Sequence, residues 1–406
     1  MNYKETVNWM FQKLPMYQTQ GATAYRKDLT NTILLANHLG NPEKELRCIH
    51  VAGTNGKGST SHMLASILQE AGYQVGLYTS PHLKDFRERI KINGVEISEE
   101  FVTTFIAQHQ CLFEENNLSF FEMSVGLAFE YFKNNQVDIA IVEVGMGGRL
   151  DATNIISPLV SVITNIGFDH MQFLGNTLDL IASEKAGIIK NKIPVVIGEY
   201  TEQTKTIFER KAKEEDAPLF FASDEITKDF TSPLKGNYQL HNKKTVLQTI
   251  RVLQSVSSFH INEESIALGF LNVIKNTGLQ GRWQQLHENP TVICDTAHNA
   301  DGLKIVITQL QEQEFRQLHI VLGVVNDKDL DDILPLFPKK ATYYFCKPNI
   351  PRGLEAHILK ENAFIFDMRG EVYNSVSEAY EAAKKNAAKE DLIFIGGSTF
   401  VVAEIL

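Results

Sequence analysis

Short apolar runs recur along the first part of the chain and are separated by longer amphipathic stretches. Strands that are buried on both faces read as continuous apolar runs, and the helices that connect parallel strands show a helical period. This alternation predicts an α/β fold with a mainly parallel sheet covered by helices on both faces. The runs that we expect to form its strands are Arg47–Ala52, Gln74–Thr79, Asp138–Val144, Val160–Ile163 and Ile193–Ile197.

A second series of apolar runs begins near Thr291 and predicts a smaller, Rossmann-like α/β domain with a doubly wound sheet. The polar stretch His287–Pro290 interrupts the pattern just before it. We therefore expect the first domain over residues 1–288 and the second over residues 289–406. The second domain's expected strands are Thr291–Cys294, His319–Val325, Ala341–Cys346 and Leu392–Ile395, with helices over 302–313 and 376–388.

The composition of the 406 residues excludes several classes of protein. A formal net charge of -10 argues against binding to nucleic acid, because phosphate contacts call for a basic surface. The start of the chain lacks a secretory signal, and no apolar stretch is long enough to cross a membrane, so we expect a cytoplasmic protein. No C-x-x-C pair suggests a metal or redox framework among Cys48, Cys111, Cys294 and Cys346.

Residues Arg47–Ala71 contain a strand, a glycine-rich turn and a helix, in the order that a phosphate-binding P-loop requires. Glycines let successive backbone N–H groups face phosphate oxygens, and Lys57 can reach the β and γ phosphates. The common pattern has a further glycine where this chain has Val51, and a hydroxyl where it has Gly58. We expect a nucleoside triphosphate, ATP, to be bound by Gly53, Thr54, Asn55, Gly56, Lys57, Gly58 and Ser59.

Polar residues that could hold Mg²⁺, which prefers oxygen ligands, follow three of the expected strands. Ser80 comes directly after the run that ends at Thr79, and Glu143 lies near the end of its own run. Open α/β sheets bind ligands at the carboxyl ends of their strands, so both are candidate metal ligands. His170 follows Val160–Ile166. From the residues alone it is either a ligand or a structural histidine satisfied by its neighbours.

A second glycine-rich segment, EVGMGGRLDATN, covers Glu143–Asn154 and carries the charges of Arg149 and Asp151. Similar glycine runs occur in dinucleotide-binding folds, where a helix opens directly after the glycines. No amphipathic pattern follows Gly148. The sequence therefore disfavours a dehydrogenase.

Eight motifs spread over nearly the whole chain resemble the folylpolyglutamate synthase and dihydrofolate synthase family, relatives of the Mur peptidoglycan ligases. Each motif is modest alone, but all eight stand in the family's order. They are GTNGKGS at Gly53–Ser59, TSPHL at Thr79–Leu83, RERI at Arg87–Ile90, EVGMGGRLDATN, FDH at Phe168–His170, EKAGIIK at Glu184–Lys190, GRW at Gly281–Trp283 and DTAHN at Asp295–Asn299.

The resemblance implies roles that the residues alone could not give. It implies Mg²⁺ ligands at Ser80, Glu143 and His170, and a carbamylated lysine at Lys185 whose added carboxylate holds a second Mg²⁺. Adenine and ribose contacts fall on Asn242, Arg282 and Asp295, and His298 lies near the phosphates. The implied catalytic residues are Lys57, Lys185 and His298, and the implied pterin contacts are Phe121, Glu122, Leu150, Asp151 and Ala152.

Two positions depart from the family's pattern. The family often has G-x-H-Q-x-x-N where this chain has GNYQLHN, so Tyr238 replaces a histidine and the alignment of Asn242 is less secure. The motif DTAHN carries Thr296 where glycine is usual. Neither departure removes a charged group that the chemistry needs, so we expect activity to survive.

The resemblance predicts a ligase that uses ATP to join L-glutamate to dihydropteroate, a reduced folate, or both, through an acyl phosphate. We expect a monomer whose domains close on ATP. Two alternatives remain open. One is a Mur-type ligase that acts on a cell-wall precursor, and the other is a P-loop binding or switch protein without ligase chemistry.

Overall fold

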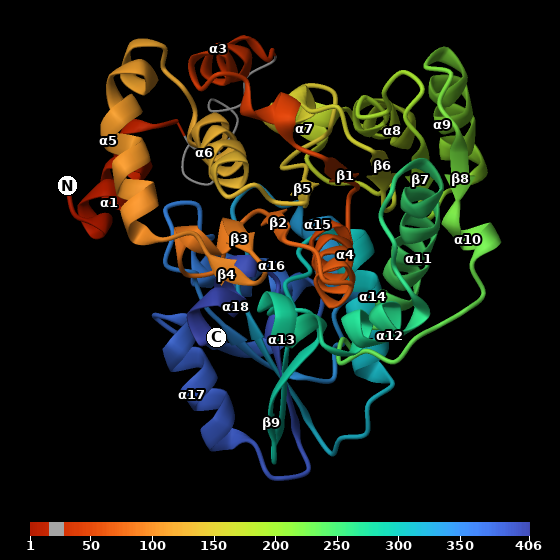
Figure 1. The fold of residues 1–406 in the computed structure, drawn as a ribbon. Helices are drawn as coiled ribbons and strands as arrows, with labels where there is room; N and C mark the ends of the chain where they lie inside the picture. The colour runs from red at the N-terminus through yellow and green to blue at the C-terminus, as the bar shows by residue number, and fades with distance from the viewer. Residues whose placement is uncertain (16–27) are drawn as a thin grey trace. The chain divides into compact units, whose positions relative to one another are not determined.

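The computed structural model describes residues 1–15 and 28–406, which form two compact units. The first unit contains Met1–Pro233 and Gln239–Leu279, and the second contains Leu234–Tyr238 and Gln280–Leu406. Figure 1 labels the elements of both units. The predicted α/β class, with a P-loop-containing sheet domain and a smaller Rossmann-like domain, is confirmed.

The first unit is built on an eight-stranded sheet with the order β4-β3-β2-β5-β1-β6-β7-β8. The strands β2, β5, β1, β6, β7 and β8 pair parallel with their neighbours in this order. Strand β3 pairs antiparallel with both β2 and β4. The central strands are fully buried, as their continuous apolar runs predict. The strands are β1 (Cys48–Ala52), β2 (Val75–Tyr78), β3 (Ile90–Ile92), β4 (Val95–Glu96), β5 (Ile139–Glu143), β6 (Val160–Ile163), β7 (Val195–Ile197) and β8 (Leu219–Phe221).

Helices α4 and α11 pack on the sheet of the first unit, and other helices pack on neighbouring helices. Helix α4 starts at the P-loop and packs against α11, α12 and α13 (Figure 1). The α-helices are α1 (Tyr3–Lys13), α3 (Thr30–His38), α4 (Lys57–Glu70), α5 (Glu99–Glu115), α6 (Phe120–Asn134), α7 (Met171–Leu174), α8 (Leu178–Ala186), α9 (Glu202–Glu214), α10 (Ala222–Glu225), α11 (Gln239–Val256), α12 (Glu263–Leu271) and α13 (Val273–Thr277). The 3₁₀ turns are η2 (Pro42–Glu45), η3 (Phe86–Arg89) and η4 (Ala152–Ile155).

The second unit has a six-stranded sheet with the order β13-β12-β11-β14-β10-β9. All pairs are parallel except β10 with β9. The strands are β9 (Gln284–Glu288), β10 (Thr291–Cys294), β11 (Leu318–Leu322), β12 (Thr342–Phe345), β13 (Arg369–Val372) and β14 (Leu392–Gly396). The helices are α14 (Ala300–Gln311), α15 (Leu330–Ile333), η5 (Leu334–Leu336), α16 (Ala356–Ile365), α17 (Val376–Asn386) and α18 (Thr399–Ile405).

The expected strands and helices of both sheets are present, with ends that shift by one to a few residues. After Gly148 the described chain continues into the short turn η4 and no long helix, as expected. The domain limits 1–288 and 289–406 stay a prediction, and the antiparallel pair β9 and β10 lies on both sides of that limit. Within the described residues, no helix combines the length and apolarity that a membrane span requires.

Candidate active site

The P-loop leaves β1 and enters α4 through two glycines with positive φ. Gly53 has φ 143° and Gly56, the residue that caps α4, has φ 85°. A Cβ at Gly53 would lie 1.8 Å from the Thr164 hydroxyl, and one at Gly56 would lie 2.2 Å from the Asn242 amide oxygen. Only glycine fits at these two positions, so the loop backbone can approach an anion at the helix N-terminus.

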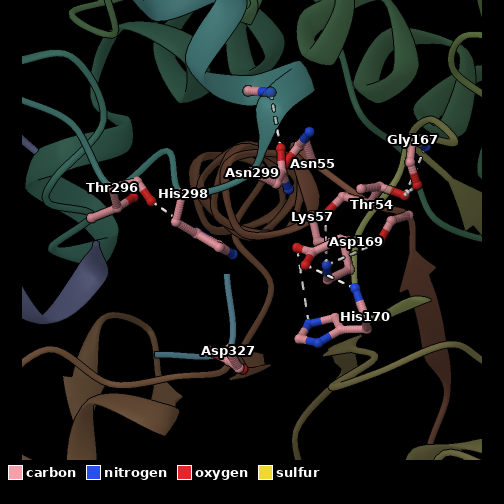
Figure 2. A network of polar contacts seen from close by, with 12 residues as sticks. Thr54, Asn55, Lys57, Gly167, Asp169, His170, Thr296, His298, Asn299 and Asp327 are labelled. Carbon is pink, nitrogen blue, oxygen red and sulfur yellow. Dashed lines mark hydrogen bonds and ion pairs between the residues drawn. The ribbon is translucent and has the colours of Figure 1, made fainter. Parts of the chain in front are cut away.

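The segment that follows β6 holds the P-loop in place. The backbone N–H of Thr54 donates to the Asn165 carbonyl at 3.0 Å, and the N–H of Asn55 donates to the Asn165 side chain at 2.9 Å. The Thr54 hydroxyl accepts from the N–H of Gly167 at 2.9 Å, a bond visible in Figure 2. These bonds fix the conformation of the loop.

Two lysines point their amines at one carbonyl oxygen of the P-loop. Nζ of Lys57 donates to the Gly53 carbonyl at 2.9 Å, and Nζ of Lys185 donates to the same oxygen at 3.0 Å. Lys185 is buried on α8, and its burial together with the charge of Lys57 lowers the pKa of its amine to about 7. A substantial part of the Lys185 amine is therefore neutral near pH 7.

Ser80 and Glu143 are neighbours at the carboxyl ends of β2 and β5, which run parallel. The backbone N–H of Ser80 donates to Oε2 of Glu143 at 3.1 Å, and the Glu143 carboxylate is buried. Hydroxyl and carboxylate oxygens are ligand types that Mg²⁺ prefers. Ser80 and Glu143 thus have the donor chemistry that the predicted site requires, and their role as metal ligands stays a prediction.

His170 begins α7 with a left-handed backbone, φ 50°, directly after Asp169. Its N–H donates to the Asp169 carboxylate at 2.9 Å, and its Nε2 lies 3.9 Å from Oδ2 of Asp169 (Figure 2). Across residues 1–15 and 28–406, no three side chains among His, Cys, Asp and Glu come together in a way that could hold a metal ion. The full ligand set of Ser80, Glu143, His170 and Lys185 stays a prediction.

The carboxylate of Asp151 holds the second glycine-rich loop. Its Oδ2 accepts from the N–H of Met146 at 2.9 Å, and its Oδ1 accepts from the N–H and hydroxyl of Thr153 at 3.0 and 2.5 Å. Burial raises the pKa of this carboxyl. The Phe121 ring packs so closely on Gly145 that a Cβ there would lie 2.4 Å from it. Asp151 thus has a structural task in the loop that carries Leu150 and Ala152.

Glu122 likewise has a structural task. Its carboxylate accepts from the N–H of Ser119 at 2.7 Å, and its own N–H donates to the Ser119 hydroxyl at 3.2 Å. This reciprocal pair is a capping box at the start of α6. The pterin contacts that we expect at Phe121, Glu122 and Leu150–Ala152 stay predictions.

Asp295 of the second unit is buried and fully hydrogen-bonded. Its Oδ2 accepts from the Tyr238 hydroxyl at 2.6 Å and from the N–H of Trp283 at 2.7 Å, and its Oδ1 accepts from the N–H of Ala297 at 2.8 Å. Burial raises the pKa of Asp295. The position that departs from the family's histidine, Tyr238, thus supplies a donor to this carboxylate.

The other departure, Thr296, contacts Arg282. The guanidinium of Arg282 donates to the Thr296 hydroxyl and, at 3.3 Å, to the Gly281 carbonyl. Nδ1 of His298 lies 3.0 Å from the Thr296 carbonyl oxygen, as Figure 2 shows. Arg282 precedes β9, whereas Asp295 and His298 follow β10. Hydrogen bonds from Arg282 to Thr296 and from Trp283 to Asp295 join the two segments.

Sequence reasoning missed a side chain that braces the P-loop. Nε2 of Gln239 donates to the Ser59 hydroxyl at 3.0 Å, and its Oε1 accepts from the Asn242 amide at 2.9 Å. Gln239 and Asn242 are buried and lie three residues apart, on one face of α11. In the sequence, Gln239 stands out only as the glutamine of the family's pattern G-x-H-Q-x-x-N. That pattern does not show that its partner is Ser59.

Two known domain families match the chain. The Mur ligase middle domain matches residues 51–271, and the Mur ligase glutamate ligase domain matches residues 281–399. Together they include the P-loop, the second glycine-rich segment and the loop of Asp295.

The curated relatives share about a third of their residues with this chain. The dihydrofolate synthase/folylpolyglutamate synthase of Bacillus subtilis is 31% identical over 435 residues, which cover 99% of this chain and 98% of the relative. A probable bifunctional folylpolyglutamate synthase/dihydropteroate synthase of Haloferax volcanii is 32% identical over 100% of this chain. The chain spans 50% of the length of that relative.

Solved structures with the same fold carry ligands. Escherichia coli FolC in complex with DHPP and ADP has a TM-score of 0.88 and 30% identity, covering 100% of this chain and 97% of that chain. A bifunctional folylpolyglutamate synthase/dihydrofolate synthase with Mn, AMPPNP and L-glutamate bound has a TM-score of 0.86 and 28% identity, covering 100% and 97%.

Proposed function

Since this chain belongs to the dihydrofolate synthase/folylpolyglutamate synthase family with Mur ligase domains, it is an ATP-dependent glutamate ligase, and we propose that it attaches L-glutamate to dihydropteroate, to reduced folates, or to both. One observation carries the proposal. The amines of Lys57 and Lys185 converge on the Gly53 carbonyl at the base of a preformed P-loop. Such a loop can hold the transferred phosphoryl group of ATP.

The nucleotide would lie on Gly53–Ser59, with its charged phosphates at the N-terminus of α4. Asn242 and the second unit's Arg282 and Asp295 would contact adenine and ribose, and His298 would lie near the phosphates. Mg²⁺ would be held by Ser80, Glu143, His170 and the carbamylated form of Lys185. When bound, one or two such ions supply positive charge that neutralises the phosphoryl oxygens.

The reaction joins a carboxylate and an amine, which do not condense unaided. A carboxylate oxygen of the acceptor attacks the γ phosphorus, the bond from that phosphorus to the bridging oxygen breaks, and ADP leaves. The amine of glutamate then attacks the acyl carbon, the bond to the phosphate oxygen breaks, and phosphate and a proton leave. Lys57 and the loop N–H groups stabilise the charge on the transferring group.

Carbamylation of Lys185 is favoured by its buried, partly neutral amine, since only a neutral amine adds to CO₂. NMR of protein equilibrated with isotopically labelled bicarbonate measures the adduct directly. We expect one carbamate signal that is absent from Lys185→Ala. A wild-type spectrum without that signal would exclude the modification.

The acceptor is settled by an assay of ADP release by the purified protein with Mg-ATP and L-glutamate. Dihydropteroate, tetrahydrofolate, a cell-wall precursor and no acceptor are compared, and products are identified by mass. We expect a gain of one glutamate on dihydropteroate, tetrahydrofolate or both. A gain only on the cell-wall precursor, or ADP release that is independent of every acceptor, would refute the folate assignment.

A further inference from the structure

Arg89 is a buried cation at the end of the 3₁₀ turn η3. It keeps 3% of its surface exposed and donates through Nε to Nδ1 of His82 at 2.8 Å. Its guanidinium carbon lies 5.2 Å from the centre of the Phe120 ring. Within the part of the chain that the structure describes, it forms no ion pair with a carboxylate at 4.0 Å or less. A buried charge without a counter-ion destabilises a protein by several kcal/mol.

Arg87, the other arginine of the RERI motif, forms an ion pair with a carboxylate and can be compared with Arg89. Arg87 binds both oxygens of Asp85, with Nε and a terminal nitrogen each 3.0 Å from them. That pairing raises the pKa of Arg87, whereas burial lowers the pKa of Arg89. Arg89 therefore differs from Arg87, because it is buried and does not belong to the ion-pair network of Arg87 and Asp85.

The surroundings of Arg89 belong to the candidate active site. Burial lowers the pKa of Arg89, and this lowering is opposed by Tyr78, through charge and a side-chain hydrogen bond, and by the charges of Glu143 and Glu88. Tyr78 and Glu143 lie at the ends of β2 and β5. Glu143 contacts Ser80, and the Tyr78 hydroxyl lies 2.8 Å from the Ser124 hydroxyl on α6. The same helix carries Phe121, on the expected pterin side. Arg89 thus lies near the expected metal ligand Glu143 and over the ring of Phe120, which directly precedes the expected pterin contact Phe121.

We propose that Arg89 binds the carboxylate of the acceptor that the enzyme activates, an inference that rests on the proposed function. The charges are complementary, because the acceptor carboxylate is an anion and the buried guanidinium of Arg89 is a desolvated cation. Guanidinium groups bind carboxylates in a fixed planar geometry. One carboxylate oxygen is held by Arg89 while the other remains available to attack the γ phosphorus.

The same contact assists the second step. When the amine of glutamate attacks the acyl carbon, the carbonyl oxygen held by Arg89 takes up negative charge. The electron pair on that oxygen then re-forms the C=O double bond, the bond from the carbon to the phosphate oxygen breaks, and phosphate leaves together with the proton lost by the amine. The charged guanidinium stabilises this oxygen more strongly in the tetrahedral state than in the neutral acyl phosphate. This difference in stabilisation accelerates amide formation.

A binding cycle tests the contact without turnover. Calorimetry measures the dissociation constants of dihydropteroate and of its neutral carboxamide analogue for wild type and Arg89→Gln, and the same pair is measured for tetrahydrofolate and its γ-carboxamide. A charge-assisted bond stabilises by about 1.5–3 kcal/mol. We therefore expect wild type to bind the carboxylate at least about tenfold more tightly than the amide. In Arg89→Gln this ratio should fall to about one.

Two further variants keep the test decisive. Arg89→Lys keeps the charge and should restore part of the ratio, and Arg87→Gln changes the paired arginine of the same motif and should leave the ratio unchanged. A wild-type ratio of one for an acceptor that is turned over, or an undiminished ratio in Arg89→Gln, overturns the inference alone. Wild-type protein that neither binds nor glutamylates any pterin overturns the proposed function as well.

Discussion

At the scale of single residues, Gln239 explains how the P-loop hydroxyl is oriented. The Ser59 oxygen accepts a hydrogen bond from Gln239, so the hydroxyl proton points elsewhere and can be donated to a phosphate oxygen. The bond from Asn242 fixes which end of the Gln239 amide faces Ser59. Lys57 and Ser59 could be predicted from their spacing alone, but Gln239 could not, because its partner lies 180 residues away in sequence.

Replacing Gln239 by methionine should weaken nucleotide binding. The change keeps the volume and removes both hydrogen bonds, which are worth about 1 kcal/mol each. We expect the dissociation constant of ADP, measured by calorimetry, to rise about tenfold. Gln248→Met is the matched control, since Gln248 is also buried on α11 but donates to Glu225.

The control should lose stability without losing affinity for ADP. If both variants bind ADP as wild type does, Gln239 only stabilises the fold. If both lose affinity equally, the effect comes from α11 as a whole and the proposed orientation of Ser59 is wrong.

At the scale of elements, the strands that were predicted are the apolar ones, and those that were missed are short or polar. Strand β4 has two residues, β13 is largely exposed at a sheet edge, and β9 reads QQLHE. None of them has an apolar period to detect. The sequence also singled out Glu122 and Asp151 as expected pterin contacts, and these roles stay predictions. It could not show that each carboxylate accepts hydrogen bonds from backbone N–H groups close to it in sequence.

Asp151→Asn should loosen the second glycine-rich loop, since an amide cannot accept at both of its ends. The N–H of Met146 or the donors of Thr153 would then face an NH₂ group. We expect the free energy of unfolding to fall by about 1–3 kcal/mol and the KM for the pterin acceptor to rise at least about fivefold. The dissociation constant of ADP should stay unchanged.

The control for this loop is Arg149→Gln, which removes an ion pair with Glu184 whose arginine side chain is 55% exposed. An exposed pair contributes little, so its unfolding free energy, measured with urea, should match wild type. Equal KM values for wild type and Asp151→Asn would mean that the loop is not on the pterin side.

At the scale of the whole molecule, acid stability depends on a histidine within the central sheet. His50 on β1 is fully buried and its Nε2 lies 2.8 Å from the Thr153 hydroxyl. Burial, followed by the charge of Lys190, lowers the pKa of His50 to about 3. Because the folded pKa is below the unfolded value of about 6.5, the neutral ring stabilises the fold fully above that pH and progressively less below it.

We expect His50→Gln to flatten the pH dependence of stability. The wild type should lose about 2 kcal/mol more than the variant between pH 7 and pH 5, since each unit below the unfolded pKa costs about 1.4 kcal/mol. Urea unfolding of both proteins at the two pH values measures the difference. Parallel losses would show that His50 is accessible to protons in the folded state.

The two-domain plan could be predicted because apolar runs form two series, but the path of the chain between the units could not. The piece Leu234–Tyr238 belongs to the second unit although unit-one residues flank it on both sides. The side chain of Gln309 accepts from the N–H of Asn237 at 2.6 Å and donates to the Lys235 carbonyl at 2.8 Å. Such bonds over long sequence distances leave no trace in local composition.

That interleaved path limits how the protein can be divided, by evolution or in the laboratory. A fragment that starts at Gln280 would contain the whole six-stranded sheet, yet Asp295 would lose the phenol of Tyr238. Exchange of the second unit between relatives therefore has to include the five residues Leu234–Tyr238, which precede Gln280 by about forty positions in the sequence. Recombination at one junction would yield a chimaera with an unmatched buried carboxylate, so the second unit of this chain can be exchanged only together with the segment Leu234–Tyr238.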